Sequence, residues 1–119
     1  MFFIYGFFYI IQMSTSSQVI KLSSRSDIKL FIRQNKRCII MYGAKYCGSC
    51  NMIYPLYRRA SKCYHKKLAF GYVDTKNSYA SITAIPMFKG YYRGKFIDDA
   101  VGADEQAMKK LVKKLISLP

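Results

Sequence analysis

The stretch CIIMYGAKYCGSC, residues 38–50, joins a continuous apolar run to two cysteines that are separated by two residues. The apolar run CIIMYGA (38–44) has the length of a strand, and its lack of polar alternation is typical of a strand buried on both faces. Beyond it, side chains that suit one buried helical face recur at spacings of three and four: Cys50, Ile53, Tyr54, Tyr57, Ala60 and Tyr64. The sequence therefore places the CxxC pair between a buried strand and the N-terminus of a helix, which Pro55 is expected to kink.

The remaining segments alternate between strand and helix patterns. Strands are predicted at 19–22, 68–74, 87–92 and 96–102, with a hairpin turn at 93–95 and a loop or short helical turn over 75–83. A helix is predicted over 26–37, with Ser26 as its N-cap and with Lys36 and Arg37 at its C-terminal end. A last helix follows the cap Asp104 and has a predicted buried stripe of Met108, Leu111, Val112 and Leu115. This order predicts an α/β fold, a mixed β-sheet with helices on both faces.

The CxxC pair suits redox chemistry at this position. Unpaired backbone N–H groups and the helix dipole stabilise an anion at a helix N-terminus, so they lower the pKa of a cysteine there. The first sulfur, on Cys47, is predicted to attack a disulfide, and Cys50, one turn later, to resolve the mixed disulfide. Lys45 adds positive charge beside the pair.

A zinc site is the weaker interpretation of the same cysteines. Zinc needs four ligands, and the other candidates are Cys38, Cys63 and His65. Cys38 lies in the strand before the pair, and Cys63 lies along the helix, about 20 Å from Cys50 by helix rise. We therefore expect no metal and no cofactor, and we expect Cys38 and Cys63 to be packing residues or free thiols.

Length and composition indicate one globular domain with an excess of positive charge. The chain has 119 residues, a formal net charge of +14 and four cysteines, too few for a disulfide-stapled miniprotein. The charge favours anionic partners through nonspecific attraction, or it is simply a solvated surface. No motif for nucleic-acid binding accompanies it.

The N-terminus leaves the compartment open. Residues 1–17 begin with an uncharged apolar segment that is too short to span a bilayer as a helix, and a second start is available at Met13. The segment is predicted to be an apolar extension, a signal or anchor, or a stretch upstream of the natural start. We expect a cytoplasmic protein, with a secretory, membrane-anchored or virion location as the alternative if residues 1–16 act as a signal.

Taken together, these motifs resemble thioredoxin, over roughly residues 18–118. Tyr46-Cys47-Gly48-Ser49-Cys50 resembles the WCGPC active site, and Pro55 resembles the proline of the helix that follows it. Ile85-Pro86 is similar to the cis-proline segment of the family, Gly94 to its hairpin glycine, and Gly102-Ala103 to the loop before its last helix. The resemblance implies a thioredoxin fold over the domain 18–119.

The resemblance also implies roles for residues around the cysteines. Cys47 and Cys50 would form the redox disulfide, with Cys47 as the nucleophile. Pro86 would shape a substrate groove, and the backbone of Ile85 would pair with an extended client segment. The rim would be formed by Tyr46, Gly48, Ser49, Gly102 and Ala103. The implied partners are disulfide-containing client proteins and a thioredoxin-reductase-like recycling enzyme, and the implied state is a monomer.

Three departures from the family pattern change what is expected. Ser49 replaces the usual proline, which frees one more donor at the helix start and should favour the thiolate. The family's buried acid aligns with Met41, and its partner lysine aligns with Phe70. With both lost, we expect slower resolution of mixed disulfides or a proton relay through water; the mixed-disulfide lifetime of Met41→Asp would measure the effect.

The function predicted from the sequence is that of a thiol–disulfide oxidoreductase that reduces protein disulfides. One alternative is an oxidant or isomerase of the secretory pathway or of a virion. A second is a redox-silent thioredoxin-like module that only binds its partners, although such modules usually lack one or both cysteines, and this chain keeps both.

Overall fold

The computed structural model describes residues 18–77 and 82–119. The predicted N-terminal extension over 1–17 and residues 78–81 of the predicted loop over 75–83 lie outside these ranges. The elements, in order, are β1 (Val19–Lys21), α2 (Arg25–Gln34), β2 (Arg37–Gly43), α3 (Gly48–Tyr64), β3 (Ala69–Asp74), the 3-10 turn η1 (Thr75–Asn77), β4 (Met87–Tyr92), β5 (Lys95–Val101) and α4 (Glu105–Ile116). The predicted strands and helices are therefore all present in the described part of the chain.

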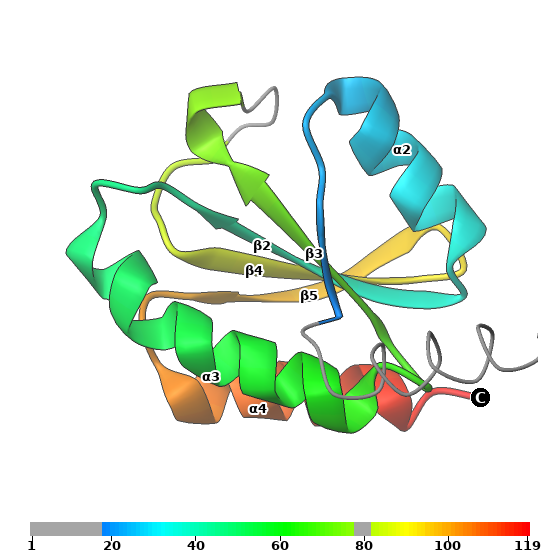
Figure 1. Cartoon of the computed structure of the whole chain (residues 1–119). Helices are drawn as coiled ribbons and strands as arrows, with labels where there is room; N and C mark the ends of the chain where they lie inside the picture. The colour runs from blue at the N-terminus through cyan, green and yellow to red at the C-terminus, as the bar shows by residue number, and fades with distance from the viewer. Residues whose placement is uncertain (1–17, 78–81) are drawn as a thin grey trace, which may run out of the picture.

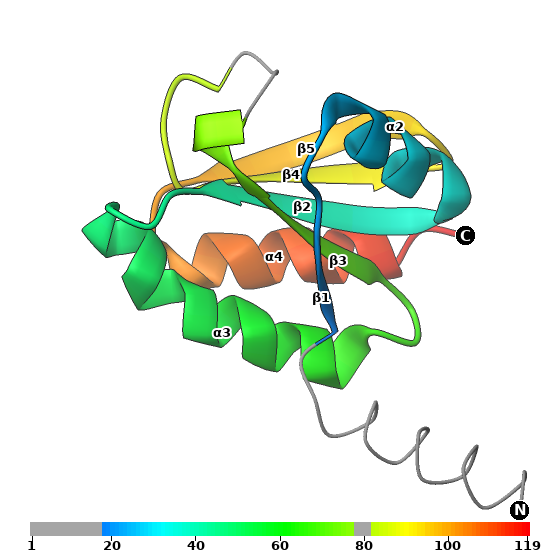
Figure 2. The ribbon, with the colours of Figure 1, turned by 45° about the horizontal axis from the view of Figure 1, so that its top comes forward.

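One mixed sheet carries the fold, with the strand order β1-β3-β2-β4-β5 among the described residues. β1, β3 and β2 run parallel, while β4 is antiparallel to both β2 and β5. Helix α2 covers one face of the sheet, and α3 and α4 lie side by side over the other (Figures 1 and 2). The prediction of a mixed sheet with helices on both faces is confirmed.

The central strand β2 explains why the apolar run is continuous. Ile39 and Met41 pack into the core under α3 and α4, whereas Cys38, Ile40 and Tyr42 pack into the core under α2. All five side chains are at most 1% exposed. Since neighbouring side chains on a strand point to opposite faces, a strand with a helix layer on each side has no polar positions to fill.

The boundaries of α2 differ from the prediction. Its N-cap is Ser24, not Ser26, because the Ser24 hydroxyl accepts the Asp27 N–H at 3.1 Å. The Asp27 carboxylate in turn accepts the Ser23 N–H at 3.0 Å, so two donors at the helix start are satisfied. The helix ends at Gln34, and Arg37 opens β2 instead of closing the helix. The residue types in this segment alone did not show which of the serines caps the helix.

Helix α3 buries a slightly different stripe from the predicted one. Cys50, Ile53 and Tyr57 are buried as expected, but the next buried position is Ser61, and Tyr64 is 36% exposed. Ser61 is tolerated inside because its hydroxyl donates to the Arg58 carbonyl at 2.6 Å. The stripe predicted for α4 is confirmed in full.

The predicted hairpin joins β4 and β5. Arg93 and Gly94 have φ values of 50° and 81°, the left-handed conformation that both central residues of a tight two-residue turn require.

None of the helices in residues 18–77 and 82–119 has both the length and the apolar character that a membrane span requires.

Candidate active site

Three loops meet at one end of the sheet, and the strand register shows why. Tyr42 near the end of β2 pairs with Met87 at the start of β4, and Met87 pairs with Val101 at the end of β5. The CxxC pair follows β2, Pro86 precedes β4, and Gly102 follows β5, so all three lie at the same end of the molecule (Figures 1 and 2). Antiparallel pairing thus brings together residues that are about 55 positions apart in the sequence.

The two cysteines occupy the first turn of α3. Cys47 is the N-cap of α3, and its sulfur accepts the backbone N–H of Cys50 at 3.2 Å. The pair is joined as a disulfide with the two Cα atoms 5.2 Å apart. Cys47 is half-buried, whereas Cys50 is only 2% exposed and belongs to the core. The first sulfur is therefore the more open of the two to a molecule that approaches from solvent.

The predicted rim residues surround Cys47 at different depths. Tyr46 is 84% exposed, and Gly48 and Ser49 are also exposed at the start of α3. Met52, one turn later, is 74% exposed and was not predicted as part of the site. Exposed apolar side chains just before a reactive sulfur and in the next turn of its helix form a surface suited to a client protein. An apolar position that breaks the buried stripe of a helix is the sequence signal that could have identified Met52.

The second wall of the site is formed by the loops before β4 and after β5. The Ile85–Pro86 peptide bond is cis, as the resemblance implies, and Pro86 is buried while Ile85 is half-buried. The Gly102 N–H donates to the Pro86 carbonyl at 2.8 Å. Gly102 has a φ of 92°, which favours glycine, and Ala103 beside it is exposed. The structure thus joins the predicted residues of both loops through a hydrogen bond.

Side chains of α3 fix the turn that carries the cysteines. The Asn51 side-chain amide donates to the Lys45 carbonyl at 3.0 Å, which ties the first turn of the helix to the loop before it. The Ser49 hydroxyl oxygen lies 3.3 Å from the Cys47 sulfur. The sequence predicts an extra backbone donor at Ser49, and the structure adds the hydroxyl as a second donor for a Cys47 thiolate. In the first turn of α3 there is no acidic residue to oppose that charge.

Removing the Ser49 hydroxyl is expected to raise the pKa of Cys47. Ser49→Ala removes one donor to the thiolate, and loss of a hydrogen bond to the charged form of an acid disfavours that form. Ser49→Pro removes the backbone N–H as well and should raise the pKa further. Ultraviolet absorbance of the thiolate against pH, in a Cys50→Ala background, measures both shifts. An unchanged pKa in Ser49→Ala would show that the hydroxyl makes no such bond.

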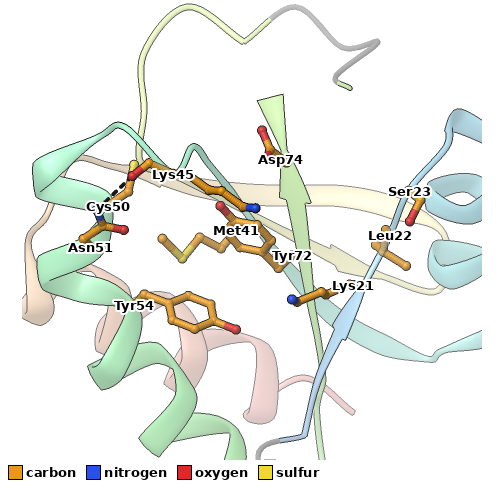
Figure 3. A pocket seen from close by; sticks show the side chains of 10 residues that line it. All are labelled: Lys21, Leu22, Ser23, Met41, Lys45, Cys50, Asn51, Tyr54, Tyr72 and Asp74. Carbon is orange, nitrogen blue, oxygen red and sulfur yellow. Dashed lines mark hydrogen bonds between the residues drawn. The ribbon is translucent and has the colours of Figure 1, made fainter. Parts of the chain in front are cut away.

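A pocket reaches Cys50 from the side of β1 and β3. Its volume is about 350 Å³, and Figure 3 shows the residues that line it: Lys21, Leu22, Ser23, Met41, Lys45, Cys50, Asn51, Tyr54, Tyr72 and Asp74. Tyr54 and Tyr72 pack edge to face, with ring centroids 5.4 Å apart. Neither tyrosine was predicted as a site residue. Tyr72 is identified as a pocket residue by the parallel register, which pairs it with Met41. The spacing of residues in the sequence does not give this register.

The other two cysteines lie away from this site. Cys38 is fully buried in β2, and burial raises the pKa of its thiol to about 12. Cys63 is a free, exposed thiol near the end of α3. In residues 18–77 and 82–119, no group of three or more His, Cys, Asp or Glu side chains is arranged to hold a metal ion.

Comparisons with known proteins agree with this geometry. The family model for thioredoxin matches residues 18–115. Thioredoxin 1 of Plasmodium falciparum is 33% identical over 97 residues, which cover 78% of this chain and 93% of that protein. Thioredoxin H-type of Chlamydomonas reinhardtii is 37% identical over 86 residues, which cover 68% of this chain and 76% of that protein.

Solved structures show the same fold. A structure of Plasmodium falciparum thioredoxin matches with a TM-score of 0.75 and 33% identity, over 80% of this chain and 97% of that one. Mitochondrial thioredoxin 3 from Saccharomyces cerevisiae matches with a TM-score of 0.76 and 27% identity, over 82% and 95% of the two chains. The paired cysteines at the start of α3, the fold and these relatives lead to one conclusion: the chain belongs to the thioredoxin family and is an oxidoreductase that acts on protein disulfides.

Proposed function

We propose that Cys47 is the attacking thiolate, that Cys50 is the resolving thiol, and that the net direction is reduction of client disulfides. The unequal exposure of the two sulfurs carries the assignment, since Cys47 is half-buried at the helix N-terminus and Cys50 is 2% exposed. Two donors, the Cys50 N–H and the Ser49 hydroxyl, lie within hydrogen-bond reach of the Cys47 sulfur. A sulfur in this position is the better thiolate and the one that a client can reach.

The exchange runs in two steps. The Cys47 thiolate attacks one sulfur of the client disulfide, a Cys47–client bond forms, and the other client sulfur leaves as a thiolate that takes a proton from water. Cys50 then loses its proton and attacks the Cys47 sulfur. The Cys47–Cys50 disulfide forms as the client thiolate leaves, so the client gains two electrons and the protein loses two. The distance of 5.2 Å between the Cα atoms fits the disulfide that this step produces.

The client is expected to bind as an extended segment beside Ile85. The loop that carries Ile85 and Pro86 enters β4 directly and is tied to Gly102, so it offers backbone groups next to the cysteines in a fixed position. An added strand can bond to such a backbone whatever its side chains are, which suits an enzyme with several clients. Tyr46, Gly48, Ser49 and Ala103 would contact the side chains of the client.

Alkylation of the reduced protein tests the assignment. With a limiting amount of iodoacetamide near neutral pH, Cys47 is expected to react first and the exposed Cys63 more slowly. Cys50 should be protected by burial. Cys38 should not react, because with a pKa of about 12 only about one in 10⁵ of its thiols is ionised at pH 7. Peptide mass spectrometry after timed quenching gives the order, and modification of Cys50 before Cys47 would reverse the proposed roles.

The direction of exchange is tested by recycling. We expect an NADPH-dependent thioredoxin reductase to reduce the Cys47–Cys50 disulfide, so that NADPH is consumed continuously when a disulfide client such as insulin is present. Consumption should stop when either cysteine of the pair is replaced. If the reductase does not turn over and the oxidised protein instead transfers its disulfide to reduced clients, the protein is an oxidant.

Location and assembly are further parts of the proposal. A cytoplasmic monomer fits a CxxC pair in a chain with few other cysteines, which is typical of a reducing compartment. Fractionation of cells that express chains starting at Met1 or at Met13 tests the location, and gel filtration tests the monomer. A signal at the N-terminus would direct only the longer chain to the secretory pathway.

The charge of +14 is proposed to give nonspecific attraction to anionic partners. Filter binding to nucleic acid at rising salt tests this, because nonspecific affinity should disappear near physiological salt.

A further inference from the structure

In the resolving step a buried thiol, that of Cys50, has to ionise. Cys50 must lose its proton before it can attack, yet its sulfur lies in the core and is 2% exposed. Burial in apolar surroundings disfavours a thiolate. Met41, which packs in the same core cluster, has only a thioether and neither donates nor accepts a proton at this site. Met41 therefore cannot help Cys50 to ionise, and any side chain that does so must come from elsewhere around the sulfur.

Strand β3 brings a hydroxyl to this position. Tyr72 pairs with Met41 in the parallel register, and its side chain packs against the core cluster that contains Cys50. A Cβ atom added at Gly43 would lie 3.2 Å from the Tyr72 hydroxyl oxygen and 3.3 Å from the Cys50 sulfur. The hydroxyl and the sulfur thus flank the same point above Gly43, and they are no farther apart than the sum of the two distances, about 6.5 Å.

The pocket described above opens onto both groups. Tyr72 and Cys50 line it together, its lining includes several polar side chains, and its volume of about 350 Å³ is ample for water. One water molecule bridges polar atoms up to about 6 Å apart, and the upper bound of about 6.5 Å on the separation of the hydroxyl and the sulfur is close to that reach. The Tyr72 hydroxyl would donate a hydrogen bond to the water, and the water would donate one to the Cys50 sulfur. A hydrogen bond donated to the sulfur favours its thiolate form.

We propose that the Tyr72 hydroxyl, acting through a water in this pocket, stabilises the thiolate of Cys50 and so positions that sulfur for release of the client. The proposal rests on the role of Cys50 as the resolving thiol. The proton that Cys50 loses passes to the pocket water and on to solvent, and the departing client thiolate takes a proton from solvent. Tyr72 keeps its own proton throughout.

Three observations favour Tyr72 over Asp74 and Tyr54, two other polar residues of the pocket. Burial, with the nearby Asp74 carboxylate and Tyr54 as smaller causes, raises the pKa of Tyr72 above its usual value, so the hydroxyl remains a donor at neutral and mildly alkaline pH. The Asp74 carboxylate accepts the Lys76 N–H at 2.9 Å, which directs it to its own loop at the end of β3. Figure 3 shows the Tyr54 hydroxyl pointing toward Lys21, away from Cys50.

A substitution at Gly43 tests the same contact independently. A methyl group on Gly43 would lie 3.2 Å from the hydroxyl oxygen and 3.3 Å from the sulfur, so it would crowd the space between the two groups. Gly43→Ala should therefore weaken the contact between the Tyr72 hydroxyl and the Cys50 sulfur, although both groups remain in the protein. Because both changes remove one interaction, the effects of Gly43→Ala and Tyr72→Phe should not add.

The test separates the two steps of exchange in the full chain, with Cys63→Ser to remove the exposed thiol. The reduced protein is mixed with an aromatic disulfide whose thiol product is coloured. The first phase of colour reports attack by Cys47, and the second reports resolution by Cys50. The second phase is followed from pH 5 to pH 10, and the charged side chains that also line the pocket are Lys21, Lys45 and Asp74.

In Tyr72→Phe we expect the second phase to slow about tenfold at pH 7, because loss of the donated hydrogen bond leaves fewer Cys50 thiols ionised, and to reach the wild-type rate at high pH, where the thiol ionises without that help. The first phase should not change. Tyr54→Phe is the matched control from the same pocket and should behave as wild type. A second phase that is unchanged in Tyr72→Phe, or that is slowed equally at every pH, would overturn the proposal. Failure of the proposed roles looks different, because the second phase would then be absent from the wild type as well.

Discussion

Cys47→Ser is expected to lose at least about a thousandfold of the disulfide reductase activity. A serine hydroxyl has almost no ionised form at neutral pH, so neither the helix N-terminus nor the Cys50 N–H can turn it into a nucleophile that opens a disulfide. The Cys50 sulfur cannot take over, because it is 2% exposed and faces the core. Turbidity from insulin reduction with dithiothreitol as the electron source measures the loss.

The matched control for this variant is Cys63→Ser. It removes an exposed thiol of the same chemistry near the far end of α3 and should leave the rate unchanged. The folded state of both variants is checked by circular dichroism. If Cys47→Ser kept the wild-type rate, the reaction would have to run through another thiol, and the site would be wrongly assigned.

Tyr57→Ala is expected to lower the free energy of unfolding by about 3–5 kcal/mol, the largest stability effect that we expect from one side chain. Tyr57 is 0% exposed and joins α3 to the sheet. Its hydroxyl lies 2.7 Å from the Gly71 carbonyl and 3.1 Å from the Ile39 carbonyl, and its ring lies 5.4 Å from the rings of Phe70 and Phe88. The substitution removes the apolar contact, both hydrogen-bond contacts and the aromatic pairs, and it leaves a cavity at the centre of the core.

Two further variants show how much of this loss comes from the hydroxyl and how much depends on burial of the side chain. Tyr57→Phe keeps the ring and should lose only about 1–2 kcal/mol, since it removes the hydroxyl from two buried carbonyls. Tyr46→Ala removes a tyrosine that is 84% exposed and should change stability by less than about 0.5 kcal/mol. Urea midpoints at fixed pH compare the three variants. A loss below about 1 kcal/mol in Tyr57→Ala would mean that the core does not depend on this residue.

The fold was predictable from sequence because its main signals are local. The buried strand 38–44 has no polar position, since it has helix layers on both faces, and the α4 stripe follows one helical face without interruption. The errors lie at element ends. Ser24 and Ser26 are both good caps by residue type, and only the position of Asp27 relative to each of them decides between the two.

The site was predictable where it lies in one segment, and less so where it depends on register. Cys47 and Cys50 follow from their place at the start of a helix, and the resemblance supplied Pro86 and Gly102. Tyr72 could not be found in this way, because its nearness to Cys50 depends on the pairing of β3 with β2 and on the absence of a side chain at Gly43. Met52 was missed although its apolar side chain lies outside the buried stripe of α3, which is a signal in the sequence.

The most direct test of the proposed chemistry is to trap its intermediate. Reduced Cys50→Ala, in the Cys63→Ser background, is mixed with a client protein that carries one disulfide, quenched with acid and digested without reductant. The account predicts a stable mixed disulfide between the client and Cys47, found by mass spectrometry and absent from Cys47→Ala treated in the same way. A client attached to Cys38, or no covalent adduct while wild type reduces the client, would contradict it.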